Sequence, residues 1–370
     1  MKISIITRHA IANYGSLLQT IALQNKINAL GHEAEVIDFI KDNESYLKST
    51  LTAGMTREKF RRNPILLFCY CLVHLPLSVV SDLIFESYRK QYLNLTKRYT
   101  SSKQLKEDKP IADVYMTGSD QVWGPVMDGK HEWTYFLDFC DVMDKRVAYA
   151  ASFGKTELST EDAVTVKELL QKYNYITVRE DSAVKILENY AINSEQVIDP
   201  TLLLTSAEWE ALLDVESTSS REKYILVYQI HKNKDLEKYA IEFTKKTGLK
   251  LLRVSPLLHQ FARGGKFIYA PSLARFVALI NNAEYLITDS FHGTAFAINF
   301  NTPLVTMLPK TGTSSRNLSI LKLLHLEECI VSNNTDFSIL DRKISFDYAN
   351  QQLQYEREKS QRALQRIIEE

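Results

Sequence analysis

The chain has 370 residues, of which 45% are hydrophobic, and its 45 basic residues equal its 45 acidic ones. This length favours two domains, because a single hydrophobic core stops growing before it is reached. The net formal charge of zero argues against nucleic-acid binding, which needs a basic footprint, but it allows a local basic pocket for a small anion.

Short β-rich runs alternate with helical patterns along the chain, which predicts an α/β fold with parallel sheets. The predicted strands are 3–7, 34–39, 113–118, 146–152, 175–180 and 195–200 in the first half, and 224–229, 250–254, 284–288 and 303–307 in the second. The predicted helices between them are 16–30, 159–172, 181–188, 234–247 and 272–282.

The apolar stretch 64–85, PILLFCYCLVHLPLSVVSDLIF, interrupts this alternation and is nearly long enough to cross a bilayer. His74, Pro76 and Asp82 break its apolar character. We therefore expect two buried or interfacial helices, separated near Pro76. A peripheral contact with the inner face of the membrane through 64–85 is the less favoured alternative.

The four cysteines, Cys69, Cys71, Cys140 and Cys329, fit neither a disulfide framework nor a four-ligand zinc site. Cys69 and Cys71 lie near His74, but their apolar surroundings favour buried packing over a metal site. These features predict a reducing, cytoplasmic location without a metal. The first residues, MKISIITRHA, read as a strand and not as a signal peptide.

A polar stretch, LLDVESTSSREKY, predicts a domain boundary near 206–222. We expect a Rossmann-like domain at 1–205 with a helical insertion near 56–95, and a second Rossmann-like domain at 206–344. A charged amphipathic helix at 345–370 is expected to return to the first domain. Ligands bind at the carboxyl ends of parallel strands, so we expect a cleft between the two domains and functional residues just after the strands.

The residues after the first predicted strand form a turn that leads directly into a helix. Asn13 and Tyr14 precede Gly15, which allows a close backbone approach, and Ser16, which is expected to cap the helix. Backbone amides at a helix start attract anions, so these four residues are candidate anion contacts. An ordinary strand-to-helix turn explains them equally well.

Ser119 and its successors follow the strand 113–118 within TGSDQVW. Asp120 offers an acceptor, Gln121 an amide and Trp123 an aromatic face. A sugar needs paired hydrogen bonds for its hydroxyls and an apolar surface for its ring. This mixture therefore favours a sugar contact, and a turn with a packing tryptophan is the alternative.

Two arginines are candidate anion clamps. Arg179 ends the predicted strand 175–180, and Arg316 follows a later strand together with Ser315. A guanidinium can grip a phosphate or carboxylate through two parallel hydrogen bonds. Arg179 can equally form a structural salt bridge with its neighbour Glu180, and the sequence does not separate the two.

His292 occupies the turn between the strand 284–288 and a helix entered through Gly293 and Thr294. Imidazole transfers protons near neutral pH, and the helix amides can hold a phosphate oxygen. We favour a functional histidine over one that merely caps the turn, because glycine and small hydroxyls surround it.

Seven motifs in series resemble the polysaccharide pyruvyl transferase family, and they cover nearly the whole chain: NYGSLLQTIALQNKINALGHEAEVIDF, TGSDQVW, YAASFG, VREDSAVKIL, VIDPTLLL, TDSFHGTAFAINFNTPLV and SSRNLSILKLLHL. The resemblance implies a fold similar to GT-B glycosyltransferases. It also implies transfer of the enolpyruvyl unit of phosphoenolpyruvate onto two hydroxyls of a sugar, with no metal or redox cofactor.

Under this resemblance His292 is the acid/base or the phosphate contact, and Arg316 and Arg179 clamp the donor. Asp120 joins the catalytic residues, and Ser119, Gln121 and Trp123 bind the acceptor. The donor or anion contacts would be Asn13, Tyr14, Gly15, Ser16, Ser290, Gly293, Thr294 and Ser315. Family members often carry an arginine where this chain has Ser290, so Arg316 or Arg179 would supply that charge.

Two other functions remain open on the same architecture. One is a nucleotide-sugar glycosyltransferase that uses the His292 turn for a diphosphate. The other is a non-catalytic member of a polysaccharide-assembly complex, held near the membrane. The expected acceptor is a sugar or a lipid-linked saccharide of the bacterial envelope.

Overall fold

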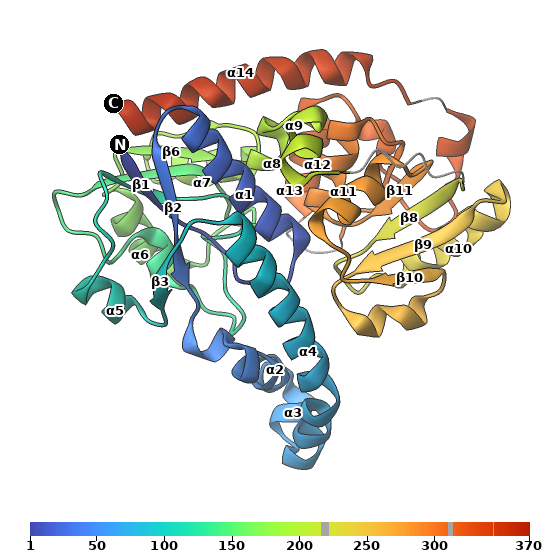
Figure 1. Cartoon of the computed structure of the whole chain (residues 1–370), viewed down its shortest axis with the longest axis horizontal. Coiled ribbons are helices and arrows are strands. Elements are labelled where there is room, and N and C mark those ends of the chain that lie inside the picture. Colours follow the sequence, from blue (N-terminus) through green and yellow to red (C-terminus); the bar gives the residue numbers. More distant parts are fainter. Residues whose placement is uncertain (216–221, 310–313, 343) are drawn as a thin grey trace. The chain divides into compact units, whose positions relative to one another are not determined.

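A computed structural model describes residues 1–215, 222–309, 314–342 and 344–370 (Figure 1). The contacts divide these residues into two compact units, each of which is described by itself. Unit 1 comprises Met1–Pro200 and Gln361–Glu370, and unit 2 comprises Thr201–Ser360. Residues 216–221, within the polar stretch that predicts the boundary, lie outside the described residues.

Unit 1 contains a seven-stranded parallel sheet in the order β3-β2-β1-β4-β5-β6-β7. The central strands are buried on both faces, which explains their continuous apolar sequences. The strands are β1 Lys2–Ile6, β2 Glu33–Phe39, β3 Leu95–Tyr99, β4 Val114–Thr117, β5 Lys145–Ala151, β6 Tyr175–Val178 and β7 Glu195–Gln196.

Helices cover this sheet between the strands. The sheet and three of the helices, α5, α6 and α7, contribute side chains to one hydrophobic cluster. The helices of unit 1 outside its insertion are α1 Tyr14–Ala29, α5 Ser102–Glu107, α6 Thr160–Leu170 and α7 Asp181–Glu188, with 3₁₀ turns η1 Asp42–Glu44 and η2 Trp133–Phe136.

Unit 2 contains a five-stranded parallel sheet in the order β10-β9-β8-β11-β12. Its strands are β8 Tyr224–Tyr228, β9 Lys250–Ser255, β10 Lys266–Tyr269, β11 Tyr285–Thr288 and β12 Leu304–Thr306. Its helices are α9 Ser206–Leu213, α10 Lys234–Thr247, α11 Leu273–Asn281, α12 Phe291–Phe300 and α13 Ser314–Leu323, and α8 Pro200–Leu203 begins at the boundary. Its 3₁₀ turns are η3 Leu258–Arg263, η4 Glu327–Cys329 and η5 Ser338–Asp341.

Aromatic packing fixes the helices of unit 2 on its sheet. The Phe276 ring of α11 contacts Tyr228 of β8 at 5.0 Å between centroids, and Phe296 of α12 at 6.2 Å. Side chains of α10 join a separate cluster with β8, β11 and β12. Two hydrophobic layers thus enclose the sheet.

In each sheet the order of successive strands reverses direction at one place, called the switch point. It lies between β1 and β4 in unit 1 and between β8 and β11 in unit 2. Such a switch point leaves room beyond the carboxyl ends of the two central strands, where ligands of open α/β sheets bind. The predicted fold class, two Rossmann-like α/β domains, is therefore confirmed.

The helix α14, Asp347–Glu369, belongs to unit 2 through Ser360 and to unit 1 beyond it. Within unit 2, Arg357 donates to the Leu202 carbonyl at 2.7 Å. Within unit 1, Arg366 pairs with Glu195 and the Ile368 carbonyl accepts from Lys145. One helix therefore contributes to both units.

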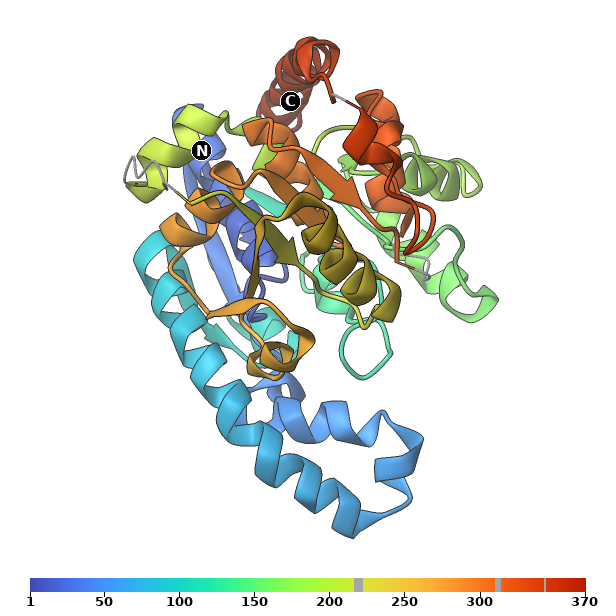
Figure 2. The same cartoon turned by 90° about the vertical axis from the view of Figure 1, so that its right-hand side faces the viewer.

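The insertion of unit 1 consists of three helices, α2 Tyr46–Met55, α3 Glu58–Arg61 and α4 Pro64–Tyr92 (Figure 2). The predicted separation near Pro76 is wrong, because α4 continues through this residue. A proline disturbs a helix by removing one backbone donor and crowding the preceding turn, and α4 has three turns or more on each side to hold it. The buried packing predicted for Cys69 is also wrong, since its side chain is exposed.

Candidate functional site

At the switch point of unit 1, a hydrogen bond joins the residues that follow the two central strands, β1 and β4. The Thr7 hydroxyl, just after β1, donates to the Ser119 carbonyl, just after β4, at 2.6 Å. The helix α1 then begins at its cap, Asn13, whose side chain accepts from the amides of Gly15 at 2.8 Å and Ser16 at 3.3 Å. The prediction that Ser16 caps this helix is therefore wrong.

The same contacts correct the predicted anion site at the start of α1. The amides of Gly15 and Ser16 already donate to the Asn13 side chain. Tyr14 is fully buried, and its ring contacts Phe85 of α4. These residues shape the turn and attach the insertion to unit 1, while their amides have partners within the protein.

Asp120 lies beside Ser16, as the strand order requires. Its carboxylate accepts from the Ser16 hydroxyl at 2.5 Å and from the Gln121 amide at 2.8 Å. Its φ of 80° places it in the left-handed region, which costs a non-glycine residue of the order of 1 kcal/mol. Strain of this kind is frequent at functional sites, so Asp120 remains a candidate catalytic residue.

Arg179 lies at the centre of a buried acidic cluster. Its guanidinium binds Asp199 at 2.7 Å and lies 3.8 Å from Asp120 and 3.7 Å from Glu180. Burial alone would lower its pKa, but the three carboxylates outweigh burial and raise the pKa of Arg179. The carboxylates neutralise the cation, so the structure favours the salt-bridge interpretation of Arg179 over a donor clamp.

The predicted acceptor contacts are mostly inside the protein. Trp123 is fully buried and packs against Phe136, Phe153 and Tyr173. The prediction that it presents its ring to a sugar is wrong, because the indole completes the hydrophobic core. Ser119 is also buried, and its hydroxyl donates to Asp199 at 2.9 Å.

Gln121 is the acceptor candidate that stays partly exposed, and Gly154 shapes its surroundings. A Cβ atom at Gly154 would lie 1.8 Å from Gln121 Nε2, and Gly154 has a φ of +62°. Both facts require glycine at this strand end. The backbone of the loop after β5 therefore approaches the Gln121 amide closely.

The switch point of unit 2 is organised by Asp289, which the sequence reading left without a role. This buried carboxylate accepts from the amides of Ile230 at 2.8 Å and His231 at 3.1 Å. His231 Nδ1 lies 3.5 Å from the same carboxylate. Asp289 thus ties the loop after β8 to the end of β11 and holds a half-buried histidine there.

Ser290 caps α12 and accepts hydrogen bonds from the two amides that were predicted to bind an anion. Its hydroxyl accepts from the Gly293 amide at 3.2 Å, and its carbonyl accepts from the Thr294 amide at 3.0 Å. The Thr294 side chain is buried with Thr306 and Asn317. Both amides therefore have partners within the protein in this arrangement of the turn, and phosphate binding by them stays a prediction.

His292 is the second residue of α12 and is 5% exposed. Its ring lies edge-on to that of Phe291, with 5.2 Å between centroids. Gly293 brings this turn close to the sheet, because a Cβ there would lie 2.5 Å from Thr288 Oγ1 and 3.0 Å from the Tyr228 ring. The first turn of α12 therefore packs against the carboxyl ends of β8 and β11.

Arg316 lies on α13, the helix next to α12. Asn317 of α13 donates to Thr294 of α12 at 3.1 Å, which joins the two helices. Arg316 is 8% exposed, and Ser315 is half-buried. Residues 310–313, which precede α13, lie outside the described residues. His292 and Arg316 thus lie on adjacent helices of one unit.

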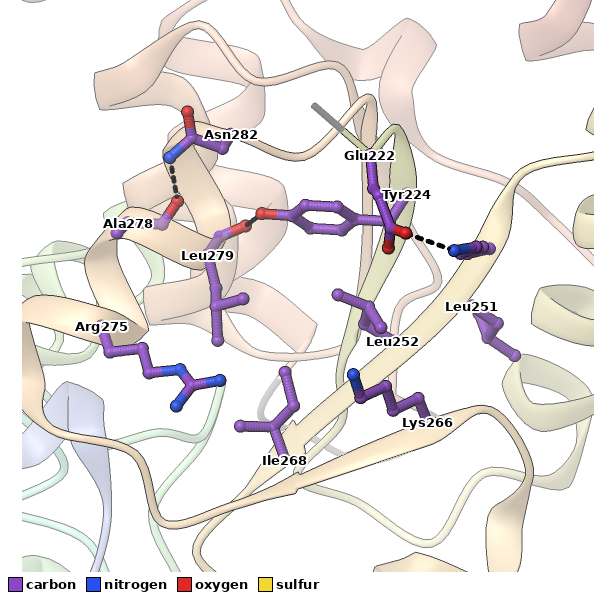
Figure 3. A pocket seen from close by; sticks show the side chains of 11 residues that line it. Glu222, Tyr224, Leu251, Leu252, Lys266, Ile268, Arg275, Ala278, Leu279 and Asn282 are labelled. Carbon is purple, nitrogen blue, oxygen red and sulfur yellow. Dashed lines mark hydrogen bonds and ion pairs between the residues drawn. The ribbon is translucent and has the colours of Figure 1, made fainter. Parts of the chain in front are cut away.

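A pocket of about 450 Å³ lies in unit 2 at the amino-terminal ends of its strands, opposite to the strand ends described above (Figure 3). Tyr224, Lys250 and Lys266, the first residues of β8, β9 and β10, line it together with α11. The Tyr224 hydroxyl donates to the Leu279 carbonyl at 2.9 Å, and Lys250 pairs with Glu222. None of the residues predicted for the site lines this pocket.

The described residues do not point to a metal centre. They contain no group of three or more histidine, cysteine or acidic side chains that could hold a metal ion. The arrangement at the two switch points instead offers imidazole, carboxylate, hydroxyl and guanidinium groups. These groups can transfer protons and bind anions and hydroxyls.

A family model described as polysaccharide pyruvyl transferase matches residues 13–310. This range begins at the cap of α1 and includes both switch points. No curated protein matches the chain.

Solved structures show what the fold is similar to. A UDP-N-acetylglucosamine 2-epimerase of Methanocaldococcus jannaschii, in complex with UDP-GlcNAc and UDP, has a TM-score of 0.52 at 13% identity, and the match covers 100% of this chain and 99% of that one. A similar epimerase assigned in Listeria monocytogenes has a TM-score of 0.57 at 9% identity, covering 95% and 90%. At such identities the likeness concerns the fold alone, which is of the GT-B type.

Proposed function

Because the chain belongs to the polysaccharide pyruvyl transferase family, we propose that it transfers the enolpyruvyl group of phosphoenolpyruvate to a sugar. The product is a cyclic ketal on two hydroxyls of an envelope polysaccharide or its precursor. The family match over residues 13–310 is the observation that carries this proposal. The placing of His292 after the central strand β11 of unit 2 supports it.

The reaction makes defined demands on the protein. A proton is added to the methylene carbon of the donor, which leaves an oxocarbenium-like centre at the neighbouring carbon. One sugar hydroxyl attacks this centre, phosphate leaves, and the second hydroxyl closes the ring. The two hydroxyl protons end on the new methyl group and on the phosphate. A proton donor, a base and cations for two anionic groups are therefore needed.

In this proposal unit 2 binds the donor. His292 supplies the proton or contacts the phosphate, and Arg316 on the adjacent helix supplies the cation. Ser290 and Ser315 lie next to these groups in the sequence and offer hydroxyl contacts. Arg316 carries the clamp alone, since carboxylates already neutralise Arg179.

His231 is a second proton carrier for the same unit. It is more exposed than His292, with 31% of its side chain accessible, and it lies beside the buried Asp289. Its Nδ1 lies 3.5 Å from that carboxylate, and imidazole is a common proton-transfer group in enzymes. We therefore include His231 among the residues that handle protons during the reaction.

Asp120 is the proposed contact for the acceptor in unit 1. Its carboxylate can accept a proton from a sugar hydroxyl, and the Ser16 hydroxyl holds it in place at 2.5 Å. The acceptor is a sugar or a lipid-linked saccharide. The donor carbons undergo no net change in oxidation state, so no redox step enters this chemistry.

The test is a proton NMR assay with phosphoenolpyruvate and a panel of envelope sugars, free and lipid-linked. A new ketal methyl signal should appear together with free phosphate. Replacing His292 by Asn should reduce the rate at least 100-fold, as expected for loss of a general acid. The matched control is His325→Asn, at an exposed position of unit 2.

Two outcomes would contradict the proposal. Turnover of a nucleotide sugar, with no reaction of phosphoenolpyruvate, would identify a glycosyltransferase. Failure of every donor, with folded protein and no effect of His292→Asn on any ligand, would identify a non-catalytic family member.

A further inference from the structure

The insertion of unit 1 presents an apolar surface that the rest of unit 1 does not cover. Its residues 46–92, here called the hairpin, form two helices joined by the short α3 and extend away from the sheet of unit 1 (Figure 2). Among its exposed large side chains, Ile65 is 75% and Phe68 67% accessible. The others are Leu51, Met55, Leu66, Leu72, Val73, Val80 and Leu83. So many uncovered apolar side chains on one insertion mark an interaction site.

A groove runs between the two helices of the hairpin. Its volume is about 360 Å³, and its lining includes Leu51 of α2 and Leu67, Phe68 and Leu75 of α4. The groove opens among the exposed apolar side chains, so it is continuous with them. Its apolar lining suits a hydrocarbon chain.

The far end of the hairpin is basic. Between α2 and α4 the residues Arg57, Lys59, Arg61 and Arg62 face a single acidic residue, Glu58, which gives a net charge of four minus one, or +3. The whole chain has a net charge of zero. Positive charge is therefore concentrated next to the apolar surface. A second copy of the hairpin would bring the same positive charges together, whereas an anionic surface complements them.

The connections of the hairpin exclude a simple transmembrane span. Among the described residues, α4 is the helix long and apolar enough to cross a membrane by length and composition alone. The chain leaves from β2 and returns to β3, and these two strands pair in one sheet. A single crossing would place them on opposite sides of the bilayer. The ten residues of α2 span only about 15 Å, which is too short for a second crossing.

The second half of α4 is fixed to unit 1. Ser81, Phe85 and Arg89 are buried, the Phe85 ring contacts Tyr14, and Arg89 donates to the Ala10 carbonyl. The free part, from Pro64 to Val80, is about 26 Å long at 1.5 Å per residue. It is shorter than the hydrocarbon core of a bilayer but long enough to lie along its surface.

We propose that the hairpin binds the surface of an anionic membrane. The exposed apolar side chains of α4 enter the boundary between headgroups and acyl chains, as those of interfacial helices do. The basic end of the hairpin contacts acidic headgroups, and the groove receives an acyl chain. This inference does not depend on the chemistry proposed for the switch points.

The test is co-sedimentation of the whole protein with vesicles of phosphatidylcholine, with and without phosphatidylglycerol. The protein should bind the acidic vesicles at least tenfold more tightly than the neutral ones. Replacing Arg57, Lys59, Arg61 and Arg62 together by Gln should weaken this binding by about fivefold per charge removed. The effect should shrink at high salt.

Two further variants test the apolar contact. Phe68→Asp and Leu72→Asp should each abolish sedimentation with vesicles while the thermal unfolding temperature stays unchanged. The matched controls are Val142→Asp and Met143→Asp, which lie outside the hairpin and are 94% and 93% exposed. For the charges, the matched control replaces four exposed lysines of unit 2 by Gln: Lys232, Lys234, Lys238 and Lys246.

Equal binding of the protein to acidic and neutral vesicles, or no binding to either, would overturn the proposal. So would equal losses in the hairpin variants and their controls. Sedimentation velocity without lipid gives a further check. A dimer that disappears in Phe68→Asp would show that the hairpin contacts another protein copy instead of a membrane.

Discussion

At the scale of single residues, the two switch points differ in how their charges are balanced. In unit 1 the guanidinium of Arg179 is surrounded by Asp120, Glu180 and Asp199. In unit 2 Asp289 binds backbone amides of the loop after β8. The first cluster resembles a buried ion-pair network, in which removal of one partner leaves uncompensated charge.

Arg179→Leu should therefore lower the free energy of unfolding by about 3–5 kcal/mol, because three buried carboxylates lose their cation. Urea unfolding followed by circular dichroism measures this change. Arg362→Leu, at an exposed position of α14, is the control and should stay within about 0.5 kcal/mol of the wild type. A stable Arg179→Leu protein that fails to bind phosphoenolpyruvate would restore the clamp interpretation.

Asp82 of α4 provides a pH-dependent test. Burial raises its pKa to about 6, although the charge of Arg89 acts in the other direction. The folded protein thus binds a proton at pH values where the unfolded chain has released it. The charged carboxylate consequently destabilises the fold above about pH 6, and this cost disappears as the pH falls towards 4.

Asp82→Asn should increase the free energy of unfolding at pH 7.5 by about 1–3 kcal/mol. The gain should vanish near pH 4. Unfolding curves at a series of pH values measure it, with Glu157→Gln in an exposed loop of unit 1 as the control. A gain that is the same at both pH values would contradict the raised pKa.

At the scale of elements, the sequence predicted the central strands and the helices between them. These strands are apolar throughout because both of their faces are buried. The edge strands β3 and β10 were not predicted. LTKRY and KFIY carry charged residues at exposed positions, which blunts an edge and also hides the strand from a search for apolar runs.

The candidate site was predicted less well than the fold. Position after a strand singled out Asp120, His292 and Arg316 as candidates, because strand ends can be located from apolar runs. It could not show that Trp123 faces the core, or that Asn13 and Ser290 already occupy helix amides. Burial and hydrogen-bond partners depend on contacts between distant segments, and single-sequence patterns do not encode them. Asp199 and Asp289 were missed for this reason.

The cap of α12 gives a prediction for this element. Ser290→Ala should lower the free energy of unfolding by about 1 kcal/mol, because the Gly293 amide loses its partner. Ser290→Asn should remain within a few tenths of a kcal/mol of the wild type, since asparagine is an equally good cap. Thermal and urea unfolding measure both variants. Equal losses in the two variants would show that the hydroxyl acts in another way.

At the scale of the whole molecule, we propose that each unit binds its own substrate. The proposed donor contacts, His292 and Arg316, belong to unit 2, and the proposed acceptor contact, Asp120, belongs to unit 1. Only α14 and the boundary at Pro200 join the two units along the chain. Donor binding and turnover should therefore respond differently to changes in unit 1.

Asp120→Asn should leave the affinity for phosphoenolpyruvate within about twofold of the wild type, while ketal formation falls at least 100-fold. Asparagine tolerates the left-handed backbone of this position, so the fold should persist. Calorimetric titration and the NMR assay give the two quantities. A parallel loss of donor affinity would contradict the division of substrates between the units.

The most direct test of the central claim is calorimetric titration of phosphoenolpyruvate into the wild type and Arg316→Met. We predict saturable binding to the wild type and at least a tenfold loss in Arg316→Met, because charge-assisted hydrogen bonds contribute about 1.5–3 kcal/mol. Arg342→Met, at an exposed position of the same unit, should bind like the wild type. Equal affinities of the Arg316 variant and the wild type, or binding of UDP with no binding of phosphoenolpyruvate, would contradict the account.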